Sequence, residues 1–225
     1  MKKRLLALAS AAAIAFSITT NAFALGTAFK DIDNVSSKEK IMELQNKGVV
    51  YGTAEGVFSP GSKVTAAQSI QLLVRAFDLN LDTIRFIKAP KATDYFSKAN
   101  DNAWYAEALI IGSVRGLEFP GDMDPEHVMT REEYTYYLIK AAENYGQLPN
   151  IKLVPSEIAD DDQITAEYSG AIQRALKYGV ASLDKEDKFN PNDELSRAEA
   201  AEMLYNALEY LKAHPSQDSG LETDN

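Results

Sequence analysis

Two arginines follow residues that suit the start of a helix: Arg131 comes after Thr130, and Arg197 comes after Ser196. Thr130 and Ser196 are each followed three residues later by a Glu, which is the capping-box pattern. Each arginine then takes the first helical position, where the helix dipole disfavours a cation by ~0.3–1 kcal/mol. Backbone amides at a helix start, with a guanidinium beside them, suit a carboxylate or a phosphate. The repeated choice of an unfavourable residue therefore indicates two anion-binding positions.

These candidate residues also have a structural interpretation. The two arginines could pair with local acids such as Glu126 or Asp193, in surface ion pairs worth ~0–1 kcal/mol. Trp104, the single tryptophan of the chain, could stack on a sugar ring or pack at the start of its own helix. The residue types leave both alternatives open.

The elements that position these residues occur three times. In each copy a helix ends at a Gly, a loop with an aromatic residue or Met follows, a Pro comes two residues later, and a capping box opens the next helix. The marks are Gly48, Phe58, Pro60 and Thr65-x-x-Gln68; Gly116, Met123, Pro125 and Thr130-x-x-Glu133; and Gly179, Phe189, Pro191 and Ser196-x-x-Glu199. The cap residues are 65 and 66 residues apart, and a fixed period of this length indicates an array of similar units.

Helical periodicity dominates each copy. Apolar residues recur at helical spacing after each cap, and each Gly suits a helix C-terminal cap. The apolar sets are Ile70, Leu73, Val74 and Phe77; Tyr134, Tyr137, Leu138 and Ala141; and Met203, Leu204, Ala207, Leu208 and Leu211. Extended pieces such as residues 49–51 are too short for a large sheet. The sequence predicts a mainly α protein in which the second helices of the three copies pack together.

The first 24 residues have the features of a signal peptide. Three basic residues open the chain, an apolar run follows from Leu5 to Ile18, and Ala22-Phe23-Ala24 is a small-x-small cleavage pattern. The run is short for a membrane span, which needs ~20 residues. Cleavage after Ala24 removes three cations and changes the net charge from −10 to −13. We expect a secreted, acidic protein with no membrane insertion after signal cleavage.

Composition and motif content argue against several function classes. An acidic protein is poorly suited to nucleic acid, whose phosphates need a basic surface. The chain has no Cys, its histidines are His127 and His214, and no Gly-rich phosphate loop is present. The acidic runs at 160–162 and 184–187 lack the spacing of an EF-hand, which favours solvated turns. We expect no enzyme, no cofactor and no metal, with a carboxylate pair of a cell-wall hydrolase as a third, weaker alternative.

The succession of Gly, Phe-x-Pro and [ST]-R-x-E at a helix start resembles the S-layer homology domain. The best matches are Thr130-Arg131-Glu132-Glu133, Ser196-Arg197-Ala198-Glu199, Phe58-Ser59-Pro60 and Phe189-Asn190-Pro191. Trp104 stands twelve residues before Gly116 and matches the aromatic residue that opens the first helix in this family. The resemblance covers nearly the whole mature chain as three tandem copies.

The resemblance implies one unit with approximate threefold symmetry, a central bundle of one helix from each repeat, and grooves between neighbouring repeats. It also implies non-covalent attachment to secondary cell-wall polysaccharide, in many members through a pyruvate ketal whose carboxylate contacts the arginine of the motif. The ligand-binding residues implied in this chain are Arg131, Arg197, Thr130, Ser196, Trp104, Glu133 and Glu199.

The first copy departs from the family pattern. Ala66 occupies the arginine position and Gln68 replaces the acid, so a cap can form but no guanidinium is present. The tryptophan position is Ser36 in the first copy and Glu167 in the third. We therefore expect three structural copies with at most two charge-competent grooves.

These observations set the expected organisation and function. The expected segments are a signal peptide (1–24), three S-layer homology repeats (25–80, 92–146 and 155–213) and a disordered tail (214–225). The expected function is non-enzymatic anchoring at the cell wall or cell surface (S-layer) by binding an anionic cell-wall polysaccharide. The expected partners are that polysaccharide and other surface proteins. The alternative function is an extracellular protein–protein interaction scaffold whose glycan sites have degenerated.

Overall fold

The computed structural model describes residues 27–148 and 154–215, and the expected signal peptide lies outside them. The helices are α1 (Lys38–Asn46), α2 (Ala66–Ala76), α3 (Ala106–Val114), α4 (Arg131–Gly146), α5 (Ala166–Lys177) and α6 (Arg197–Ala213), with short 3₁₀ helices η1 (Ala92–Asp94) and η2 (Asp161–Gln163). Paired extended backbone in the described part consists of isolated bridges. The predicted mainly α class is confirmed.

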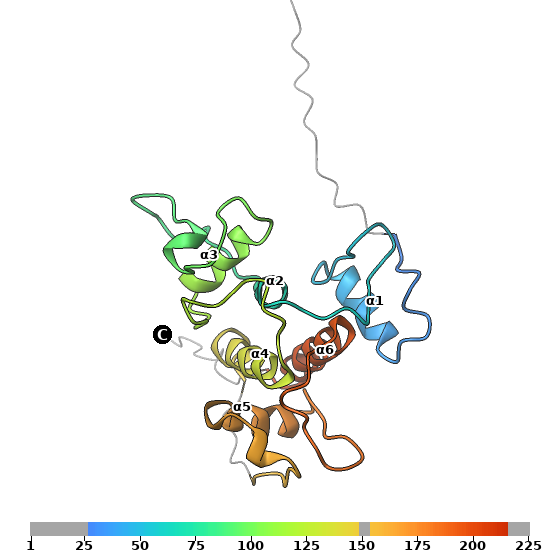
Figure 1. Cartoon of the computed structure of the whole chain (residues 1–225). Helices are drawn as coiled ribbons and strands as arrows, with labels where there is room; N and C mark the ends of the chain where they lie inside the picture. The colour runs from blue at the N-terminus through green and yellow to red at the C-terminus, as the bar shows by residue number, and fades with distance from the viewer. Residues whose placement is uncertain (1–26, 149–153, 216–225) are drawn as a thin grey trace, which may run out of the picture.

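The second helix of each copy lies at the centre of the molecule, and the first helix of each copy lies outside the central helices (Figure 1). Helices α2, α4 and α6 contact one another. Of the outer helices, α3 packs on α2, α5 packs on α4, and α1 packs on α6. Each outer helix therefore packs on a central helix from another copy, and the contact between α1 and α6 joins the two ends of the chain. The approximate threefold symmetry itself stays a prediction.

The apolar stripes predicted for the central helices form the core. Leu73 of α2, Tyr134 and Leu138 of α4, and Leu204 of α6 are fully buried. Leu208 of α6 is only partly buried. Burial of side chains of this size supplies about 1.5–3 kcal/mol each, which explains how a chain without cysteines holds its fold.

The three predicted glycine caps are confirmed. Gly48, Gly116 and Gly179 have φ angles of 70°, 86° and 67°. Each lies just beyond the end of an outer helix, in the left-handed region that a residue without a side chain adopts most easily. These glycines turn the chain from the outer helix into the loop that leads to the next central helix.

A closed ring of backbone hydrogen bonds joins the three segments that precede the central helices. The amide of Val64 donates to the carbonyl of Leu195, that of Leu195 to the carbonyl of Met129, and that of Met129 to the carbonyl of Val64, each at 3.0 Å. The three residues are themselves buried. The ring fixes the starts of α2, α4 and α6 relative to one another, and so positions every residue at the helix starts.

Candidate functional site

The three predicted capping boxes are present at the starts of the central helices. Thr65, Thr130 and Ser196 each accept a hydrogen bond from the N3 amide, and the N3 side chain bonds back to the cap amide. In α4 the carboxylate of Glu133 lies 2.8 Å from the Thr130 amide. In α6 the carboxylate of Glu199 lies 2.9 Å from the Ser196 amide. Four of the proposed ligand-binding residues are thus occupied in helix capping.

The next amides of each central helix are also occupied, which corrects one step of the sequence argument. The N1 amides donate to loop carbonyls of another copy, and the N2 amides donate to the prolines of the repeated motif. The pairs are Ala66 with His127, Arg131 with Asp193, Arg197 with Ser62, Ala67 with Pro125, Glu132 with Pro191, and Ala198 with Pro60. Because these amides have partners, the prediction of free amides for an anion at these helix starts is wrong, and any anion must be held by side chains.

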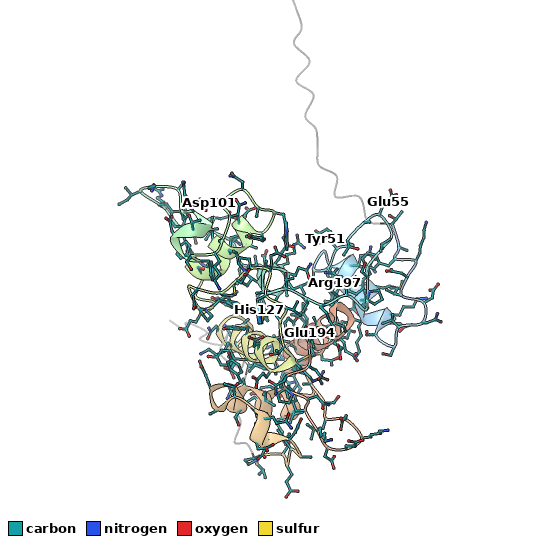
Figure 2. The ribbon with its side chains drawn as sticks, in the orientation of Figure 1. Tyr51, Glu55, Asp101, His127, Glu194 and Arg197 are labelled. Atoms are coloured by element: carbon teal, nitrogen blue, oxygen red, sulfur yellow. The ribbon has the colours of Figure 1, made fainter. Side chains whose placement is uncertain are left out.

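Arg197 reaches from α6 to the loop of the first copy. Its Nε donates to the carbonyl of Phe58 and its Nη2 donates to the carbonyl of Tyr51, both at 3.0 Å. The guanidinium covers the buried Phe58 ring at 4.8 Å from its centroid. Figure 2 shows Tyr51 and Arg197 together between α6 and the first copy. Burial lowers the pKa of Arg197, and the nearby carboxylate of Asp31 opposes that shift.

Arg131 makes the corresponding contacts with the loop of the third copy. Its Nη2 donates to the carbonyl of Ser182 at 3.0 Å, and its guanidinium lies 5.2 Å from the centroid of the buried Phe189 ring. Its Nη1 lies 3.9 Å from a carboxylate oxygen of Glu199. Within the described residues, neither arginine pairs with the Glu126 or Asp193 carboxylate that the structural alternative named.

A cavity lies beside Arg197, and we name it the Arg197 groove. It has a volume of about 560 Å³ and collects residues from all three copies. Its lining is Val50, Tyr51, Gly52, Thr53, Phe58, Gln68, Gln71, Leu72, Arg75, Trp104, Glu126, Arg197 and Ala201. Two cations and one carboxylate line it, so the groove is locally positive on a protein of net charge −10.

Trp104 lies in the Arg197 groove and is 55% exposed. The sequence placed it on a helix, but α3 begins at Ala106, and Trp104 precedes the cap residue Tyr105. Tyr105 is buried in its place and meets the indole edge-on at 5.5 Å. The core-packing interpretation of Trp104 is therefore wrong, and its exposed indole offers an apolar face to a sugar ring.

Arg75 is a groove residue that the sequence argument missed. It lies in the last turn of α2, where the helix dipole favours a cation. An arginine at this position is therefore expected for stability alone and does not indicate a ligand site. Its guanidinium stacks over the Tyr51 ring at 4.3 Å. Partial burial lowers the pKa of Arg75 from its ordinary value. The clue available in the sequence was its position ten residues after the cap Thr65, on the same helix face as Gln68.

Ala66 and Gln68, the two departures of the first copy from the family motif, do not lie together in one groove. Ala66 is fully buried, whereas Gln68 lines the Arg197 groove. A groove thus takes its arginine from one copy and its cap-face residues from the next. Replacement of the family's Glu by Gln68 therefore removes a negative charge from the groove that holds Arg197.

Two smaller cavities of about 220 Å³ each flank Arg131, and together we name them the Arg131 groove. The carboxylates of Glu199 and Glu202 line it on the α6 side. Asp184, Asp193 and Glu194 line it on the loop side, with Lys188 as a second cation. The side chain of Arg131 is only 17% exposed. The Arg131 groove is therefore acidic despite its arginine.

A further cavity of about 290 Å³ lies beside α4, and no arginine is among its lining residues. Phe119 and Tyr137 stack at 3.8 Å in its wall. Glu133, which also lines it, accepts from the cap and lies 3.0–3.1 Å from the ring nitrogen of His127. Three carboxylates, those of Asp122, Asp124 and Glu133, line this cavity against one lysine, Lys98, so the cavity is not suited to an anion.

The acidic runs form turns, but not all of their side chains are solvated. Asp160 is buried and accepts the amides of Phe189 and Asn190 at 2.8 Å. Asp31 plays the same part for Phe58 and Ser59 in the first copy. These carboxylates hold the loops that carry the motif phenylalanines. No cluster of metal-binding side chains is found in residues 27–148 and 154–215.

A family model of the S-layer homology domain matches residues 28–68 and 157–201. Two segments of the chain thus match the S-layer homology family. The matched segments contain two of the three capping boxes and Arg197. Residues 92–146 lie outside both matches, so their assignment as a further S-layer homology repeat, and the exact repeat boundaries, stay predictions.

Curated relatives agree with the family. The chain is 26% identical over 226 residues to the Surface-layer 125 kDa protein of Lysinibacillus sphaericus, covering 96% of this chain and 18% of that protein. It is also 26% identical to an Amylopullulanase of Thermoanaerobacterium thermosulfurigenes, over 84% of this chain and 10% of the relative, and to Exoglucanase XynX of Acetivibrio thermocellus, over 80% and 16%. The chain thus spans a tenth to a fifth of the length of these relatives.

The S-layer homology domain is an anchoring domain and not a catalytic one, and it occurs in cell-surface proteins, which agrees with the expected surface location. No helix in the described part of the chain is both long and apolar enough to cross a membrane. The predicted tail begins differently from expectation, because His214 caps α6 and stacks on Tyr210 at 4.1 Å. Residues 216–225 lie outside the described chain.

Proposed function

We propose that this chain attaches its protein non-covalently to the bacterial cell wall by binding an acidic wall polysaccharide in the Arg197 groove. The observation that carries the proposal is the composition of that groove. Arg197, Arg75 and the exposed indole of Trp104 line one cavity of about 560 Å³ on an otherwise acidic protein. A guanidinium suits a sugar carboxylate, such as that of a pyruvate ketal, and an exposed indole suits the apolar face of the ring.

The chemistry proposed is binding without catalysis. The carboxylate of the ligand enters the groove that the two guanidiniums of Arg75 and Arg197 line. The relatives include a surface-layer protein and polysaccharide-degrading enzymes that are five to ten times longer than the segment they share with this chain, which supports a shared attachment module. Other surface proteins remain proposed partners.

The test is co-sedimentation of the mature protein with purified cell walls and with the same walls after removal of their secondary polysaccharide. We expect sedimentation with intact walls and its loss with stripped walls. Arg197→Gln should reduce sedimentation, whereas Arg131→Gln should change it little, because the Arg131 groove is acidic. Equal sedimentation with both wall preparations would contradict polysaccharide binding. Sedimentation with neither preparation would favour the protein–protein scaffold.

A further inference from the structure

The Arg197 groove and the Arg131 groove are lined by the same positions of two different helices. Counting from the cap, residues 3, 6, 7 and 10 of α2 line the first groove, and residues 3, 6, 7 and 10 of α6 line the second. These residues are Gln68, Gln71, Leu72 and Arg75 in α2, and Glu199, Glu202, Met203 and Asn206 in α6. One helix face thus carries two neutral amides and a cation where the other carries two carboxylates and a neutral amide.

This difference sets the charge of each groove independently of the motif arginine. Both grooves contain that arginine, and in both it bonds to a loop carbonyl. In the Arg131 groove Glu199 lies 3.9 Å from the guanidinium and competes with any anionic ligand. The corresponding Gln68 of the Arg197 groove carries no charge. An anionic ligand is therefore attracted to the Arg197 groove and repelled from the Arg131 groove.

Arg75 is the less engaged of the two guanidiniums in the Arg197 groove. Arg197 donates two hydrogen bonds to carbonyls of the protein and lies near the carboxylate of Asp31. Within residues 27–148 and 154–215, the guanidinium of Arg75 has no hydrogen bond and no ion pair, and its contact is the stack on the Tyr51 ring. That stack leaves the N–H groups at the edge of the guanidinium free to donate.

The geometry points to Arg75 as the residue that binds the ligand's negative charge and makes this groove specific for acidic glycans. Arg197 is then chiefly a positioning residue, because it ties the Tyr51 carbonyl to α6 while Arg75 stacks on the ring of the same tyrosine. This inference rests on the proposed function and deepens it. It assigns the acidic substituent to one groove, and it assigns its recognition to a residue outside the repeated motif.

The experiment combines a change in the protein with a change in the ligand. Binding of purified wall polysaccharide is measured by calorimetry, with the native polysaccharide and with the same polysaccharide after its carboxylates are reduced to alcohols. The variants are Arg75→Gln, Arg75→Lys and Arg85→Gln. Arg85 is a matched control, since it is an exposed arginine that does not line the groove.

We expect Arg75→Gln to weaken binding of the native polysaccharide roughly tenfold to a hundredfold, the usual effect of losing a charge-assisted hydrogen bond. Arg75→Lys should lose less, and Arg85→Gln should bind like the wild type. With the reduced polysaccharide, wild type and Arg75→Gln should bind equally weakly.

Each contrary result has a distinct meaning. Wild-type binding that Arg75→Gln leaves unchanged would overturn the role of Arg75 and leave the proposed function standing. An equal loss with native and reduced polysaccharide would show that Arg75 supports the groove without binding charge, and would also overturn the inference. Failure of the wild type to bind the native polysaccharide would overturn the proposed function and the inference together.

Discussion

At the residue scale, the arginines at the first helical positions have a structural role that explains their unfavourable location. A cation at this position opposes the helix dipole, but the side chains of Arg131 and Arg197 extend away to loop carbonyls and cover buried phenylalanine rings. Two hydrogen bonds and a cation–π contact for Arg197 outweigh a dipole cost of ~0.3–1 kcal/mol. The repeated arginine alone therefore does not mark a ligand site. The charges of the other residues that line its groove decide whether an anion can bind there.

The first prediction separates the two arginines of the Arg197 groove by stability. Arg197→Gln should lower the free energy of unfolding by about 1–3 kcal/mol, because two loop carbonyls lose a charged donor. Arg75→Gln should cost less, at most about 1 kcal/mol, because it removes the stack on the Tyr51 ring but no hydrogen bond. Urea denaturation measures both values. Equal destabilisation by the two substitutions would contradict the division of roles.

The second prediction concerns Asp31 and pH. Burial opposes ionisation of this carboxylate, but the amides of Phe58 and Ser59 and the charge of Arg197 outweigh it and hold the pKa of Asp31 below 3.8. A lowered pKa in the folded state means that the ionised group stabilises the protein above its unfolded pKa. That contribution is lost as pH falls from about 5 through the folded pKa.

The matched variant for this prediction is Asp31→Asn, which has the same shape without the charge. Melting temperatures should show a steeper fall between pH 5 and acidic conditions for the wild type than for Asp31→Asn. Curves that run parallel over this range would exclude Asp31 as a contributor to acid lability.

At the element scale, contacts between different copies hold the central helices together. The buried hydroxyl of Tyr134 in α4 donates to the carbonyl of Ala200 in α6 at 3.0 Å. The motif prolines accept the N2 amides of helices in other copies, so the Phe-x-Pro loop caps a helix of its neighbour. The repeated motif is thus a set of connections between copies, which is why its marks recur in register.

The third prediction tests the contact between α4 and α6. Tyr134→Phe should lower the free energy of unfolding by about 1–2 kcal/mol, because it removes a buried hydrogen bond between α4 and α6. Tyr136→Phe is the control, since its hydroxyl bonds to Glu167 at an exposed site at 3.3 Å, and it should be nearly neutral. Equal effects of the two substitutions in urea denaturation would contradict the importance of the buried bond.

At the scale of the whole molecule, the arrangement is circular. α1 packs on α6, and the hydrogen-bond ring of Val64, Met129 and Leu195 closes the circle at the helix starts. The central helix on which each outer helix packs belongs to a different copy. A single copy on its own therefore cannot bury the apolar faces of its two helices. The three copies should therefore fold and unfold as one cooperative unit.

The fourth prediction follows from this arrangement. Thermal unfolding of the mature chain should show one transition, with equal calorimetric and van't Hoff enthalpies. Fluorescence of Trp104, which reports on residues 92–146, should change together with far-UV circular dichroism. Two separated transitions, or Trp104 fluorescence that changes ahead of the helix signal, would show that the copies unfold independently.

The sequence predicted the helices and their caps well, because both depend on local patterns. The apolar periodicity, the capping boxes and the three glycines each determine backbone structure only within a few residues along the chain. The groove was predicted poorly because it is built across copies. Gln68 and Arg75 line the cavity that Arg197 enters, although more than 120 residues separate them from it in sequence. The sequence also did not show that the helix-start amides already have hydrogen-bond acceptors, because these loop carbonyls come from distant segments.

The central claim is that an acidic wall glycan occupies the Arg197 groove, and the single tryptophan of the chain reports on that groove directly. Purified wall polysaccharide should change the emission of the 55% exposed Trp104 in a saturable titration. Polysaccharide whose carboxylates have been reduced should give this change only at a much higher concentration. Polysaccharide that binds the protein while the Trp104 emission stays constant would place the binding site elsewhere and contradict the account.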